Sequence, residues 1–92
     1  MRGITRKSAK RTILRRRQGG CCYWCGIAMT HRKSRVPSAE TFDHVVPKAH
    51  GGRNVFQNLV LACFACNNAR GSLAAEAFRI LVENRKRLGI PL

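Results

Sequence analysis

The sequence has 92 residues and a formal net charge of +14, from 18 Lys and Arg against four Asp and Glu. A chain of this length forms one small domain, 1–92, and such domains seldom bury enough apolar surface to fold without an added crosslink. The first residues lack the apolar segment of a secretory signal, and no stretch is apolar for the length of a membrane span. We therefore expect a soluble, intracellular, cytoplasmic protein with no membrane partner.

The positive charge favours a polyanionic partner, because an uncompensated excess of this size repels itself. Basic residues occur near both ends and in the middle of the chain, which favours nucleic acid binding over a basic tail on an unrelated domain. A purely solubilising surface is an alternative. A membrane-surface role is disfavoured, because the basic segments lack a broad apolar face.

The first predicted element is a basic helix over Thr5–Gln18, which is rich in helix-forming residues and ends at Gly19-Gly20. Its apolar edge is narrow, at Ile13 and Leu14. We expect phosphate groups to be its partner. The alternative is an arm whose residues before Ala9 are disordered in the free protein and become ordered on nucleic acid.

Cysteine pairs with C-x-x-C spacing occur twice, at Cys22 and Cys25 and again at Cys63 and Cys66. Two such pairs separated by a loop predict a structural Zn²⁺ bound by four thiolates, which would supply the crosslink that a small domain needs. The remaining cysteine, Cys21, is expected to be a small neutral residue beside the site. As an alternative, it could replace Cys22 as a ligand.

After an aperiodic basic loop over residues 29–40, the sequence predicts two strands, Glu40–Val46 and Leu59–Ala62. The loop between them contains Pro47 and the Gly51-Gly52 turn. Pairing of these strands would bring the second cysteine pair back toward the first.

Two helices are predicted at the end of the chain. A short one covers Phe64–Arg70 and stops at Gly71, and a longer one, capped by Ser72, covers Leu73–Leu88. The apolar face of the longer helix is expected to consist of Leu73, Ala77, Ile80, Leu81 and Leu88.

The chain contains, in this order, the motifs C-x-x-C, D-H, P, G-G, N-L, C-x-x-C-N and R-G. In the order and spacing of these motifs, the chain closely resembles the HNH endonucleases, in particular their zinc-containing members. The resemblance runs from about Arg15 through Gly71. It implies a small α+β protein with the ββα-metal fold, in which two antiparallel strands and a helix surround one catalytic metal. The zinc-containing core would cover residues 19–71, with a basic helix or arm, 1–18, before it and a helix, 72–92, after it.

By this resemblance, Asp43 and Asn67 are the ligands of the catalytic ion, His44 is the general base and Asn58 braces the loop that carries His44. Many members have His at the third signature position, so Asn67 makes this an H-N-N variant. The chemistry of these side chains agrees with the implied roles. Carboxylate and amide oxygens suit Mg²⁺ or Mn²⁺, and a neutral imidazole accepts a proton near pH 7. Neighbouring residues on a strand point to opposite faces, so we expect the strand to bend or end at Asp43-His44.

Each of these residues also has a simpler interpretation. Asp43 could neutralise a nearby Arg, Asn58 could be an ordinary turn residue, and Asn67 could cap a helix. His31 and His50 match no signature position and are expected to be solvated.

The sequence as a whole predicts a metal-dependent DNA endonuclease that hydrolyses phosphodiester bonds. The alternatives are a non-catalytic zinc-containing module that binds nucleic acid and a zinc-containing protein-interaction domain; the latter leaves the charge unexplained. No added specificity domain is recognisable, so we expect either weak sequence specificity or specificity supplied by a partner. Small phage-encoded members act with packaging proteins, which makes a bacterial or phage-infected cell the expected setting. The residues expected to contact phosphate are Arg15, Arg16, Arg17, Lys48, Arg53 and Arg70.

Overall fold

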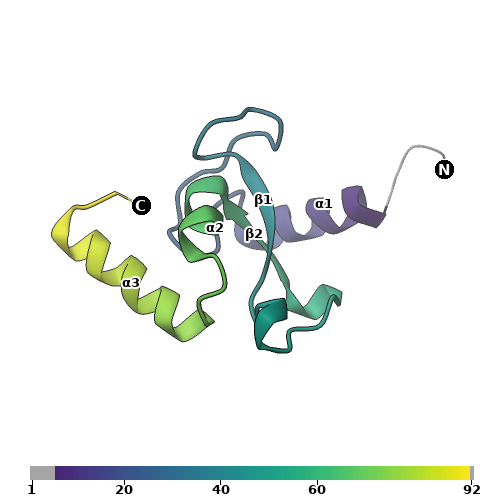
Figure 1. Cartoon of the computed structure of the whole chain (residues 1–92). Helices are drawn as coiled ribbons and strands as arrows, with labels where there is room; N and C mark the ends of the chain where they lie inside the picture. The colour runs from purple at the N-terminus through teal and green to yellow at the C-terminus, as the bar shows by residue number, and fades with distance from the viewer. Residues whose placement is uncertain (1–5, 92) are drawn as a thin grey trace.

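The computed structural model describes residues 6–91. A two-stranded antiparallel hairpin lies at the centre, and α1 and α3 extend on opposite sides of it (Figure 1). Two short 3-10 turns, Lys48–His50 and Phe56–Asn58, lie in the connection between the strands. The expected small α+β fold, a hairpin followed by a helix, is confirmed. The elements are α1 (Arg6–Gln18), β1 (Glu40–His44), β2 (Leu59–Cys63), α2 (Phe64–Arg70) and α3 (Ala75–Leu88).

Strand β2 is buried along its whole length, because other elements cover both of its faces. On one side, Leu59 and Leu61 pack with Leu14 of α1. On the other side, β2 joins a second cluster that connects the hairpin to the first cysteine pair and to α3. This second cluster consists of Cys22, Trp24, Ala62, Cys63, Cys66, Phe78 and Val82. A strand buried on both faces explains the uninterrupted apolar sequence Leu-Val-Leu-Ala-Cys.

Strand β1 pairs with β2 in a register that sets Phe42 opposite Leu61 and His44 opposite Leu59. It ends at His44, two residues before the predicted end, and the chain then bends. The expectation that the strand ends at Asp43-His44 is therefore confirmed. Since alternate residues share a face, Asp43 lies on the side of β1 that faces α2 and His44 lies on the other side.

The predicted basic helix is present, and its residues from Arg6 to Ser8 are helical. The predicted start at Thr5 and the preceding part of the arm, like Leu92, lie outside the described residues. Of the expected apolar edge, Leu14 is 4% exposed and Ile13 is 43% exposed, so only Leu14 joins the core. None of the helices described in residues 6–91 has the length and apolar character needed to cross a membrane.

Helix α3 differs from the prediction in its start and in its buried face. It begins at Ala75 with Ala74 as its N-cap, so Ser72 does not cap it. Its buried residues are Phe78 and Val82, whereas Ile80 is 56% exposed. Of the predicted face, Leu81 is partly buried against the core, whereas Leu73 and Leu88 are exposed like Ile80. The rest of the prediction was wrong because the helix packs through a narrow contact against the aromatic residues near the first cysteine pair, and Phe78 meets Trp24 edge-on with ring centroids 5.4 Å apart.

Helix α1 is attached to the hairpin by a buried carboxylate. Glu40, at the start of β1, is 4% exposed. Arg15 donates to it twice, from Nε to Oε2 over 3.0 Å and from Nη2 to Oε1 over 2.6 Å. Arg11 Nε lies 3.5 Å from Glu40 Oε1. A buried carboxylate needs such partners, because an unpaired charge in the interior is strongly unfavourable.

Replacing Glu40 with Gln should therefore lower the free energy of unfolding by about 1–3 kcal/mol, because it removes hydrogen bonds to a charged group. Urea denaturation of the zinc-loaded protein measures this change. The matched control is Glu83→Gln on the exposed side of α3, which should leave the midpoint unchanged. Equal midpoints for the two variants would contradict the structural role of Glu40.

Candidate functional site

Four cysteine side chains converge at one point in the fold. The Sγ atoms of Cys22, Cys25, Cys63 and Cys66 all lie within 4.8 Å of one another. Backbone N–H groups point at these sulfurs: Cys63 N donates to Cys22 Sγ over 3.3 Å, and Cys66 N donates to Cys63 Sγ over 3.4 Å. The expected grouping of the two cysteine pairs is confirmed.

The chemistry of this four-cysteine cluster fits a tetrahedral Zn²⁺ site. Hydrogen bonding from Cys63 and Cys66 lowers the pKa of Cys22, and hydrogen bonding to Cys22 raises the pKa of Cys63 and Cys66. Without a cation, the raised pKa of Cys63 and Cys66 favours their thiol forms, and four thiolates can share so small a volume only when a cation balances their charge. Cys21 lies outside the cluster and donates to Gly19 O over 3.6 Å.

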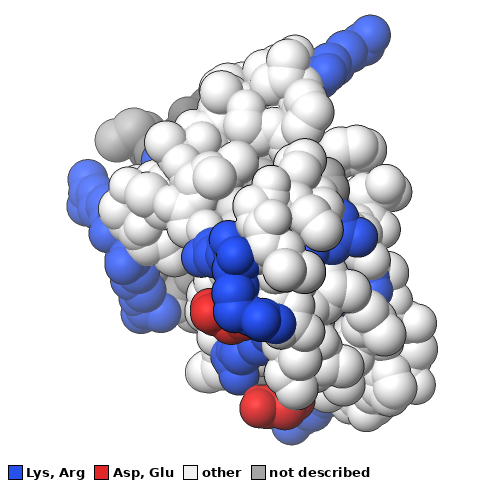
Figure 2. Space-filling view, turned by 90° about the vertical axis from the view of Figure 1, so that its left-hand side faces the viewer, with Lys and Arg blue, Asp and Glu red and all other residues white. Residues whose placement is uncertain are grey.

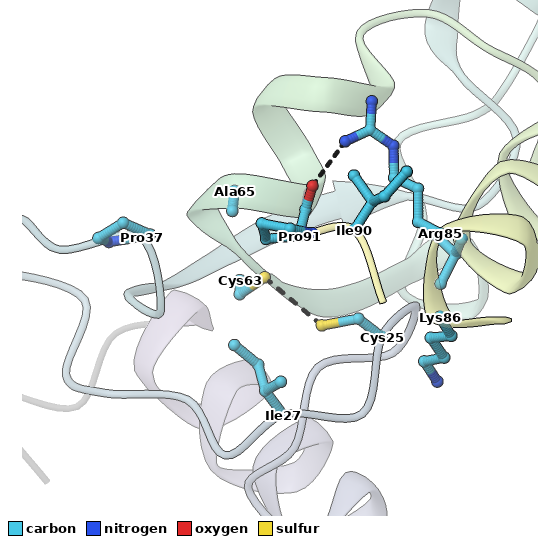
Figure 3. Close-up of a pocket in the computed structure, with 10 residues that line it drawn as sticks. Cys25, Ile27, Pro37, Cys63, Ala65, Arg85, Lys86, Ile90 and Pro91 are labelled. Carbon is cyan, nitrogen blue, oxygen red and sulfur yellow. Dashed lines mark hydrogen bonds between the residues drawn. The ribbon is translucent and has the colours of Figure 1, made fainter. Parts of the chain in front are cut away.

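An apolar pocket of about 320 Å³ lies beside the cluster, between it and the end of α3. Figure 3 shows Cys25 and Cys63 at one side of the pocket with their sulfurs 3.8 Å apart. Across from them, Arg85 donates to the carbonyl of Pro91 over 2.6 Å and holds the end of the described chain against α3. None of the residues predicted to be catalytic lines this pocket.

The carboxylate of Asp43 is 11% exposed and is held by three donors. Its Oδ2 accepts from Trp24 Nε1 over 2.8 Å and from Arg70 Nη1 over 2.9 Å. Its Oδ1 accepts only the backbone N–H of His44, over 2.8 Å, among the described residues. The ion pair that the sequence left open as an alternative role for Asp43 is present, and it leaves Oδ1 with room for a further ligand.

Arg70 is buried, with 2% of its surface exposed, although the sequence assigned it to phosphate binding. Besides Asp43, its guanidinium donates to the backbone carbonyls of His44, Val45 and Leu73. The prediction for Arg70 is contradicted, because a side chain enclosed in this way cannot reach an external phosphate. Its positive charge instead pairs with the carboxylate of Asp43 inside the fold.

His44 lies at the end of β1, and its Nε2 is 3.2 Å from Asn54 Oδ1. In the neutral tautomer that donates from Nε2 to this amide oxygen, Nδ1 is the proton acceptor. Asn54 was missed by the sequence analysis. Its only sequence signal is its place in the loop between the strands, four residues before Asn58.

Asn58 ties the two ends of that loop together. Its Oδ1 accepts from Val46 N over 2.9 Å, and its Nδ2 donates to Val46 O and Arg53 O, both over 3.0 Å. Gly52 passes so close to the chain that a Cβ there would lie 1.8 Å from Val46 O. The shape of the loop therefore depends on side-chain hydrogen bonds and on one close backbone approach.

Asn67 lies inside α2, whose N-cap is Cys63, so the alternative that Asn67 caps a helix is wrong. Its Nδ2 donates to Thr41 Oγ1 over 2.9 Å and to Phe42 O over 3.0 Å. Within the described part of the chain, no hydrogen bond to its Oδ1 is found. The arrangement brings Asn67 to the same side of β1 as Asp43 and orients its amide.

The other predicted phosphate contacts lie on the surface. Arg16, Arg17, Lys48 and Arg53 are exposed, whereas the charge of Arg15 is balanced by Glu40. Arg17 stacks over Phe56, 5.2 Å from its ring centroid, which brings α1 to the loop between the strands. On the face in Figure 2, basic side chains lie in several groups and both visible acidic areas adjoin basic ones.

Comparison with known proteins identifies the family of the chain. The HNH endonuclease family matches residues 22–73, more than half of the chain. A region of the CRISPR-associated endonuclease Cas9 of Corynebacterium diphtheriae is 37% identical over 57 residues, which cover 61% of this chain and 5% of that protein. The chain thus spans a small part of the length of that relative. With both cysteine pairs, Asp43-His44 and Asn67 inside the matched region, the chain belongs to the HNH endonuclease family.

Proposed function

We propose that this protein is a metal-dependent DNA endonuclease that hydrolyses phosphodiester bonds, with His44 as the general base. The observation that carries the proposal is the contact between His44 Nε2 and Asn54 Oδ1, 3.2 Å long, because an imidazole that donates from Nε2 keeps Nδ1 as its proton acceptor. A base in this state can take a proton from an attacking water near neutral pH.

The donor set on the α2 side of β1 fits a hard divalent ion. Asp43 Oδ1 and Asn67 Oδ1 are the two oxygens with spare acceptor capacity, and oxygen ligands of this kind suit Mg²⁺ or Mn²⁺. A bound ion would stabilise the negative charge that develops on the phosphate. The protein itself fixes the two oxygens, through Trp24 and Arg70 on one side and through Thr41 on the other.

DNA would be held by exposed basic residues around the loop between the strands, with Arg17, Lys48 and Arg53 the nearest candidates. Such contacts release counterions, so affinity should fall steeply with salt.

The rival function, a non-catalytic nucleic-acid-binding module, uses the same surface without the reaction. Supercoiled plasmid incubated with zinc-loaded protein, with and without Mg²⁺ or Mn²⁺, distinguishes the two. Metal-dependent nicks or breaks with 3′-hydroxyl ends support the endonuclease. Binding without any cleavage across both metals would leave the binding module as the function.

We also propose that the four-cysteine cluster holds one structural Zn²⁺. Cys63→Ser should lose the zinc and the cooperative fold together, because structural zinc contributes on the order of 10 kcal/mol in zinc-finger peptides. Cys21→Ser is the matched control and should keep both. Elemental analysis and circular dichroism measure the outcome, and folded native protein without zinc would refute the assignment.

His44→Ala should lower the cleavage rate by roughly 10²–10⁴-fold while folding, zinc content and DNA affinity are retained, because a general base acts in the transition state. Asn54→Ala should lower it roughly tenfold through misorientation of the imidazole. Both rates are measured by single-turnover plasmid cleavage. Because Asn54 is exposed, its replacement is not expected to change the stability of the protein. A His44→Ala protein that cuts at the parent rate would show that His44 is not the general base.

Asn67→Ala should require more Mg²⁺ for cleavage, and Asn67→His should shift the metal preference toward later transition metals, because imidazole nitrogen is a softer ligand. Asn68→Ala, at the neighbouring exposed position of α2, is the control and should titrate like the parent. Rates across Mg²⁺, Mn²⁺ and Ni²⁺ titrations check the prediction. Identical titrations for all variants would show that Asn67 is not a ligand.

A further inference from the structure

Trp24 and Arg70 together enclose one oxygen of Asp43. The indole Nε1 and the guanidinium Nη1 both donate to Oδ2, over 2.8 and 2.9 Å. The same guanidinium lies over the indole ring, 4.5 Å from its centroid. Trp24 is 8% exposed and Arg70 is 2% exposed, so neither side chain has room to move away. The three groups therefore fix one another.

Trp24 lies between the two cysteines of the first C-x-x-C pair, which connects the four-cysteine cluster to Asp43. Its backbone N–H donates to Cys22 Sγ over 3.4 Å, and its ring packs against Phe78 of α3. Its side chain thus extends from the four-cysteine cluster to the end of β1. A displacement of the cluster would move the donor that Asp43 Oδ2 depends on.

Arg70 provides the second connection, from the last residue of α2 to the chain on both sides of His44. It donates to the carbonyl of His44, the last residue of β1, and to the carbonyl of Val45, which follows it. Five N–H donors in a planar fork can serve a carboxylate and neighbouring carbonyls at once, which the single ammonium group of lysine cannot do. Arg70 therefore fixes the backbone conformation at His44, whose side chain is the imidazole.

We propose that Trp24 and Arg70 are positioning residues that hold the Asp43 carboxylate with Oδ2 enclosed and Oδ1 presented to a divalent ion. The proposal rests on the proposed function. Hydrogen bonds to a metal-ligating carboxylate orient it and are lost at a cost of about 10–100-fold in metal affinity or activity. Through Trp24, the four-cysteine cluster would then influence the divalent ion as well as the fold.

The decisive variant is Trp24→Phe, which removes the indole N–H and keeps an aromatic ring in the core. Zinc-loaded parent and variant are titrated with Mn²⁺, and free Mn²⁺ is measured by electron paramagnetic resonance. We expect the variant to bind Mn²⁺ about tenfold more weakly and to need correspondingly more Mn²⁺ for plasmid cleavage. Unchanged or tighter Mn²⁺ binding would overturn the proposal, because the donor would then be neutral or would compete with the ion.

Tyr23→Phe is the matched control. It alters the neighbouring aromatic residue by removing the hydroxyl that accepts from Arg79 over 3.0 Å, and it leaves Asp43 untouched. Its Mn²⁺ binding should equal that of the parent. A loss equal to that of Trp24→Phe would show that any disturbance of this segment has the same effect, which would also overturn the proposal.

A measurement on the parent protein avoids the risk that Trp24→Phe fails to fold. The chain has one tryptophan, so its indole N–H gives a single, unambiguous signal in a ¹H–¹⁵N spectrum. Substoichiometric Mn²⁺ should broaden this signal selectively, and Asp43→Asn should abolish the broadening. Mn²⁺ binding that leaves the indole signal sharp would refute the proposal. A parent that neither binds Mn²⁺ nor cuts DNA would instead refute the proposed function itself.

Discussion

The four-cysteine cluster is the constraint on which the other elements depend. Cys63 is at once the last residue of β2, the N-cap of α2 and a member of the cluster, so one position fixes the end of a strand and the start of a helix. Three of the four cysteines belong to the larger apolar core. Because that core is small, a cation that joins four thiolates would contribute much of its cohesion.

The few carboxylates of this basic protein are placed where they organise the hairpin. Of four acidic residues, Glu40 and Asp43 lie in β1 and pair with Arg15 and Arg70. Through these pairs, one short strand is joined to α1 at its start and to α2 near its end. Little acidic surface remains to offset the other basic side chains, which is the distribution expected of a protein whose charge is balanced by a polyanion.

Local patterns predicted most of the fold. Cysteine spacing predicted the cluster, and the apolar run at Leu59 together with the turn residues before it predicted the hairpin. The buried face of α3 was not predictable, because Phe78 is buried through its contact with Trp24, which lies 54 residues earlier in the sequence. Arg70 was assigned to phosphate for a related reason, since composition alone cannot distinguish a buried arginine from an exposed one. Only the fold shows that Asp43 and two carbonyls surround it.

The loop between the strands shows how a segment with little apolar contact keeps a defined shape. Its backbone leaves the hydrogen-bond ladder after His44, so its polar groups need other partners. Asn58 supplies three of them from the end of the loop, and Arg70 supplies two from α2. His44 is consequently held from both sides by polar side chains and still borders solvent. That combination of a fixed backbone and an accessible imidazole is what the proposed role of His44 as a general base requires.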